Sequence, residues 1–216
     1  MTTDPFPKGI INEIKGVSIS WGEVLVQVVS KSPALAGLPV VRSIASIVEV
    51  GRSIREHFFV EKIKTFLNCL DEVPASERAK YLCRLRDEED FQMEVGRTLA
   101  ELDLLDDHRK PKLAARLFVA YLRKNIDSST YQSLRFALLR IYAPDLGELE
   151  SFYDEFKNDP SYHGRGKNTV VALQRLSGCG LIDGPNTGLG SPNMYEINEN
   201  GQKFVEFALK NELGQK

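Results

Sequence analysis

The sequence predicts a mainly α-helical protein, in which a helical bundle is followed by a C-terminal module with a small two-stranded β-sheet. Two observations predict this class. Apolar residues recur at three- and four-residue steps over much of residues 40–142, which is the spacing of one face of a helix. Further along, the short apolar stretches 180–183 and 194–198 flank a loop rich in glycine and proline, as in two antiparallel strands joined by a long turn.

The composition indicates a folded protein and sets bounds on its partners. The 216 residues are 42% hydrophobic and 27% charged, close to the averages of globular domains. A net charge of −2 gives no global attraction to nucleic acid or to anionic membranes, so such binding would need a local patch. The three cysteines lack CxxC spacing, which argues against a disulfide framework or structural zinc, and the N-terminus lacks a secretory signal pattern. We therefore expect a cytoplasmic protein.

The N-terminal part, residues 1–55, contains a first helix expected over 20–31 and the most apolar segment of the chain, 34–50. That segment has only 17 residues and includes Pro39, Arg42 and Glu49, so it is too short and too polar for a spanning helix. Two readings remain open. It is either a buried core helix or an interfacial helix that lies on a membrane surface.

A helical bundle is expected over residues 56–127. One apolar stripe runs from about 40 to 72, with Gly51 inside it and Pro74 ending it. Further amphipathic helices are expected over 75–85 and 89–105. The next segment, 106–125, has acidic residues at its start, Pro111 in its first turn and basic residues at its end, all of which favour a helix.

The last part, residues 128–216, changes pattern. A helix is expected over 128–142 with leucine and isoleucine side chains inward, and another begins near Pro144. After a polar link, Asn168 can cap a helix that stops at Gly178 or Gly180, because glycine tolerates the left-handed conformation beyond a helix end. Two strands follow, and Asn200 is expected to cap the closing helix.

This order of elements resembles the winged helix-turn-helix family. The resemblance covers about 130–210 and is carried by "ALQRLSGCGLID" (172–183) and "YEINENGQKF" (195–204), where a third helix would run into a β wing and a glycine would precede the final helix. The resemblance implies a third helix that enters the major groove of DNA, with the wing near the backbone, although many members of the family bind only proteins. The rest of the chain carries no resemblance.

The sequence contains features that favour DNA binding and features that oppose it. Residues 163–178 contain three basic side chains and no acidic one, and the candidate DNA-contacting residues are Arg165, Lys167, Asn168, Thr169, Gln174 and Arg175. Against this, the preceding helix is acidic and the loop 184–192 has no lysine or arginine. A DNA-binding face needs a basic footprint, so a protein partner and double-stranded DNA both remain open.

No catalytic set can be assembled from neighbouring residues. The stretch "GRGKNT" (164–169) lacks the earlier glycine of a phosphate-binding loop, no metal or cofactor is indicated, and Cys179 is expected to be exposed but without a base beside it. The sequence therefore favours a non-enzymatic adaptor or regulator, of bacterial or viral type, that contacts a protein or DNA through its C-terminal module and can form a homo-oligomer. The alternative is an effector that acts at a membrane surface through residues 33–60.

Overall fold

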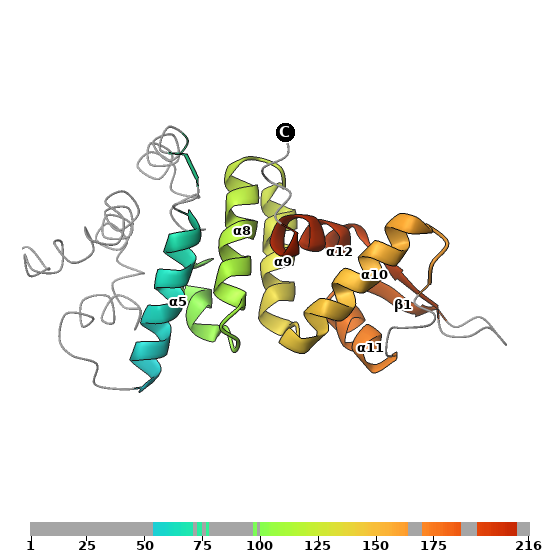
Figure 1. Cartoon of the computed structure of the whole chain (residues 1–216), viewed down its shortest axis with the longest axis horizontal. Helices are drawn as coiled ribbons and strands as arrows, with labels where there is room; N and C mark the ends of the chain where they lie inside the picture. Colours follow the sequence, from blue (N-terminus) through green and yellow to red (C-terminus); the bar gives the residue numbers. More distant parts are fainter. Residues whose placement is uncertain are drawn as a thin grey trace, which may run out of the picture. The chain divides into compact units, whose positions relative to one another are not determined.

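The structure is a computed structural model that describes residues 54–70, 73–74, 77, 97–98, 100–163, 170–186 and 194–210 (Figure 1). The chain divides into two compact units, residues 1–115 and 116–216. The described residues are mainly helical, with one two-stranded antiparallel sheet, which confirms the predicted class at this level. The helix expected over 20–31 and the apolar segment 34–50 lie outside the described residues. The division at 55/56 and 127/128 stays a prediction.

In the first unit, the long apolar stripe contains helix α5, Ile54–Leu70. Its buried side chains include Ile63, Phe66 and Leu70, spaced by three and four residues as the periodicity predicts. The helix ends four residues before Pro74, because the chain turns at Leu70, whose carbonyl accepts a hydrogen bond from the Val73 N–H (3.0 Å). Within the part of the chain that the structure describes, no helix is both long and apolar enough to cross a bilayer.

Helix α8, Lys110–Leu122, carries Pro111 at its second position, where the missing N–H costs little. Its C-terminus is closed by two hydrogen bonds, from the Asn125 N–H to the Ala120 carbonyl (2.9 Å) and from the Lys124 N–H to the Tyr121 carbonyl (3.0 Å). This is a Schellman motif, which needs a left-handed residue. Here that residue is Lys124, with φ of 61°, at a position where glycine is usual.

The second unit contains, after the C-terminal part of α8, helices α9 (Ser128–Arg140), α10 (Leu146–Asn158) and α11 (Val170–Gly178), strands β1 (Ile182–Asn186) and β2 (Met194–Ile197), and helix α12 (Glu199–Lys203). A 3-10 turn, η1 (Ala143–Asp145), joins α9 to α10. Asp127 caps α9 by accepting a hydrogen bond from the Thr130 N–H (2.7 Å). The leucine and isoleucine side chains expected to point inward are buried: Leu134 and Leu138 on α9, and Ile141 directly after it. Helix α10 contacts α11, α12 and β2.

The predicted passage from helix to sheet is confirmed. Helix α11 ends at Gly178, and Gly180 has φ of 77°. The Leu181 N–H donates to the Leu176 carbonyl (3.2 Å) and the Gly180 N–H to the Ser177 carbonyl (2.9 Å), so this is a second Schellman motif. Strand β1 pairs antiparallel with β2, with Ile182 opposite Ile197. Strand β1 extends further than predicted, because Gly184 and Pro185 belong to it and not to the loop.

The cap predicted for the closing helix was wrong by two residues. The side chain of Asn198, not of Asn200, accepts the hydrogen bond from the Gly201 N–H (3.0 Å). Gly201 itself is required by a close approach, since a Cβ there would lie 2.0 Å from the Leu181 carbonyl oxygen. After Lys203 the helix continues as a π-helix, η2 (Phe204–Leu209). Arg116 caps it by donating to the carbonyls of the last two residues of η2.

Candidate functional site

The six candidate DNA-contacting residues fall in two groups. Four of them, Arg165, Lys167, Asn168 and Thr169, lie outside the described residues. The other two, Gln174 and Arg175, lie on the exposed side of α11. The structure therefore gives the surroundings of only two of the six candidate residues, those nearest the C-terminus.

Arg175 is held inside its own unit. Its Nε donates to Asp145 Oδ2 (2.7 Å) and its second terminal nitrogen to Asp145 Oδ1 (2.6 Å), a bidentate pair that joins α11 to the start of α10. The Asp145 side chain is only 4% exposed, whereas that of Arg175 is 44% exposed. The hydrogen bonds to this carboxylate raise the pKa of Arg175. Its guanidinium also lies 5.2 Å from the centre of the Tyr142 ring. The arginine thus serves first to neutralise a buried carboxylate.

Large hydrophobic side chains are exposed on α9, on α11 and in the turn after α9. Among the described residues of the second unit, the large hydrophobic side chains that are exposed are Phe136, Tyr142, Val170 and Val171, each 51–58% exposed. The two valines lie on α11, and Val171 is one turn before Arg175, which covers the Tyr142 ring. We call the surface formed by these four side chains with Arg140, Arg175 and Gly178 the α9–α11 face.

Phe136 lines a groove that also reaches Gly178 at the end of α11. The groove has a volume of about 520 Å³ and lies between α9, the C-terminal end of α11 and the start of α12. Its lining residues are Gln132, Ser133, Phe136, Ser177, Gly178, Cys179, Gly180 and Asn200. Cys179 was expected to be exposed, and this was wrong: it is 8% exposed, in the turn that folds the chain back from α11 into β1.

The charges of the second unit are unevenly distributed over its helices. Helices α9 and α11 contain no acidic residue. Arg140 lies at the end of α9, with its guanidinium 4.9 Å from the centre of the Phe136 ring. Helix α10, in contrast, carries Glu148, Glu150, Asp154, Glu155 and the single basic residue Lys157. The α9–α11 face therefore combines exposed apolar side chains with two arginines. Neither α9 nor α11 adds a carboxylate to it.

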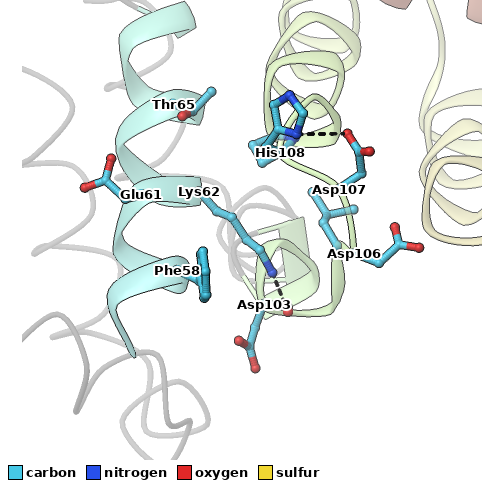
Figure 2. A pocket seen from close by; sticks show the side chains of 10 residues that line it. Phe58, Glu61, Lys62, Thr65, Asp103, Asp106, Asp107 and His108 are labelled. Carbon is cyan, nitrogen blue, oxygen red and sulfur yellow. Dashed lines mark hydrogen bonds and ion pairs between the residues drawn. The ribbon is translucent and has the colours of Figure 1, made fainter. Parts of the chain in front are cut away.

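The first unit contains a separate pocket of about 670 Å³ between α5 and the turn 103–108 (Figure 2). Lys62 Nζ donates to the Asp103 carbonyl oxygen (3.0 Å), and His108 Nδ1 lies 3.7 Å from Asp107 Oδ1. Asp107 also accepts hydrogen bonds from the side chain and the N–H of Arg109, which hold its pKa at about 2. These polar groups bind one another at the start of α8.

Comparison of the chain with models of known protein families, with curated proteins and with solved structures finds no match.

Sequence reasoning identified α11 as the important helix but did not identify the apolar face beside it. A signal for Phe136 was present. The inward residues of α9, Leu134 and Leu138, leave the position between them on the opposite side of the helix, so an aromatic residue there is expected to face solvent. The pairing of Arg175 with Asp145 had no local signal, because 30 residues separate them.

Proposed function

We propose that the C-terminal unit is a non-enzymatic contact module of winged helix-turn-helix type, and that it binds a protein partner through the α9–α11 face. The observation that carries the proposal is that α9, α11 and the turn after α9 each expose large hydrophobic side chains, and that Arg140 and Arg175 lie over two of these, the Phe136 and Tyr142 rings. Contiguous exposed apolar patches mark interaction sites in soluble proteins. Aromatic residues and arginine, both present here, are the side chains that most often dominate the energy of protein interfaces.

The order α9, α10, α11, β1, β2, α12 supports the winged-helix reading, as do the turn at Gly180 and the antiparallel strand pair. In such a module α11 is the helix that would meet the partner. Its described outer face presents two valines, one glutamine and one arginine that is already bound to a carboxylate. This composition suits a protein surface better than a phosphate backbone, which attracts uncommitted basic side chains.

The test is site-specific photocrosslinking in cells of the source organism. A benzophenone amino acid replaces Phe136 in the full chain, and in a matched control it replaces Ser151, an exposed residue of α10. We expect a protein adduct from position 136 and none from position 151. Equal adducts from both positions, or none from either, would overturn the proposal.

Binding to DNA is the other outcome and is measured in parallel. The full chain is titrated against a mixed-sequence duplex labelled with a fluorophore, from 50 to 200 mM salt. We expect weak binding that does not depend on Arg165 and Lys167. Binding that falls steeply with salt and is lost when both are replaced by alanine would favour DNA as the partner. Arg175 is left intact in this test, because its removal would leave the buried carboxylate of Asp145 without its partner.

A further inference from the structure

Arg175 is the one basic residue of α11, and its charge is directed into the unit. Nε and one terminal nitrogen of its guanidinium are occupied by the two Asp145 oxygens, at 2.7 and 2.6 Å. The Asp145 side chain is 4% exposed, so solvent screens the attraction within this pair only weakly. At its outer surface α11 therefore presents a neutral ion pair at the position where the sequence has an arginine.

Asp145 is fixed in place by the backbone. It is the last residue of η1, and its N–H donates to the Tyr142 carbonyl oxygen (2.8 Å). A buried carboxylate that loses its cation is left uncompensated, and this costs more than a single phosphate contact returns. Arg175 is therefore expected to stay with Asp145 when a polyanion approaches α11.

From this arrangement we infer that Asp145 is a specificity-determining residue of the α9–α11 face, because it keeps the charge of Arg175 from acting on polyanions such as nucleic acid. The face has two arginines, and the pair with Asp145 leaves it with the charge of one. Binding to a phosphate backbone gains affinity from the counterions that free cations displace, and a neutral pair adds no such cation. Specificity often comes from features that weaken the wrong complex. The inference rests on the proposed function and adds how the unit disfavours the other class of partner.

The test repeats the titration of the labelled mixed-sequence duplex with Asp145→Asn in the full chain. Asparagine has the size of aspartate but is neutral, and its amide nitrogen cannot accept a hydrogen bond, so Arg175 keeps at most one bond and regains its charge. One added phosphate contact steepens the log–log salt dependence by about 0.9. The gain in affinity over the unmodified chain is then about 3.5-fold larger at 50 mM than at 200 mM salt.

Two matched variants assign this gain to Arg175. Asp145→Asn combined with Arg175→Gln is expected to return the salt dependence to that of the unmodified chain, because the released cation is gone. Glu150→Gln on α10 changes the net charge by the same amount as Asp145→Asn but lies outside the pair, and it is expected to leave the salt dependence unchanged. Thermal unfolding of each variant shows whether the fold is retained.

A measurement on the unmodified chain gives an answer even if Asp145→Asn does not fold. The Nε–Hε signal of Arg175 is followed in a two-dimensional NMR spectrum while the duplex is added. We expect the signal to stay in place, because this N–H donates to Asp145 and not to a phosphate.

The inference is overturned if Asp145→Asn leaves the salt dependence unchanged, if the double variant keeps the gain, if Glu150→Gln gives the same gain, or if the Arg175 signal moves with the duplex. These failures differ from failure of the proposed function. A protein adduct at position 136 with unchanged salt dependence would keep the contact module and discard the role of Asp145. A gain that depends on Arg175, without any adduct at position 136, would keep the role of Asp145 and discard the protein partner.

Discussion

Three glycines within 24 residues predict three different outcomes when each is replaced by alanine. Gly178 is helical and its surroundings are open, so the new methyl group costs nothing and the unfolded chain loses entropy. Gly180 also has open space but has φ of 77°. Gly201 lies against the Leu181 carbonyl oxygen, 2.0 Å from the position that a Cβ would take.

The magnitudes follow from these geometries. Gly178→Ala is expected to stabilise the unit by about 0.5–1 kcal/mol, the difference in helix propensity. Gly180→Ala is expected to destabilise it by about 1–2 kcal/mol, the cost of a left-handed alanine. Gly201→Ala is expected to cost about 3 kcal/mol or more, because backbone and not a flexible side chain must move.

For a unit of this size, 1 kcal/mol shifts the melting temperature by about 4–8 °C. The assay is thermal unfolding of the full chain, combined with hydrogen exchange read at the amides of α11 and α12. Hydrogen exchange at these amides shows whether the change in stability lies in the second unit. The order Gly178, Gly180, Gly201, from stabilising to most destabilising, is the prediction. Loss of stability at Gly178 would refute its open helical surroundings, and a neutral effect at Gly201 would refute the packing of α12 against the turn after α11.

Three further predictions test other parts of the structure. Lys124→Gly is expected to raise the free energy of unfolding by about 1 kcal/mol, because Lys124 holds a left-handed position, and chemical denaturation measures it. Tyr195→Phe is expected to be neutral or to stabilise by about 1 kcal/mol, since the buried Tyr195 hydroxyl has no hydrogen-bond partner in the described structure; unchanged or higher melting temperature agrees, and a large loss contradicts it. The pKa of Asp107 lies at about 2, below its ordinary value of 3.8. The stability that this carboxylate contributes is therefore present above pH 3.8 and is lost as the pH falls toward 2. Arg109→Gln is expected to return the pKa of Asp107 toward 3.8 in an NMR titration.

The sequence allowed the local features of the second unit to be predicted, because they depend on neighbouring residues. The glycines at 178 and 180 predict a left-handed helix end, and the turn after α11 has the two hydrogen bonds that such an end requires, with Gly180 as the left-handed residue. The inward face of α9 follows from its periodicity. Even so, the cap of α12 was placed at Asn200 and not at Asn198. Both are asparagines, and only the reach of the side chain to the Gly201 N–H separates them.

Features that depend on distant residues could not be predicted in the same way. Nothing near Lys124 in sequence indicates a left-handed residue, since lysine is an unusual choice at that position. The role of Arg175 changes from a candidate phosphate contact to a partner of Asp145 only when α11 packs beside the start of α10. The burial of Cys179 likewise follows from the fold of the turn, because the residue types around it are those of an exposed loop.

The measurement that tests the contact face most directly is a paired determination of stability and affinity on Gly178→Ala in the full chain, with the partner crosslinked at position 136 as the ligand. If the partner packs against Gly178, the Gly178→Ala variant has a higher melting temperature than the unmodified chain and binds the partner about tenfold more weakly. Affinity that is unchanged while the melting temperature rises would contradict the account, because the ligand would then bind without approaching this end of α11.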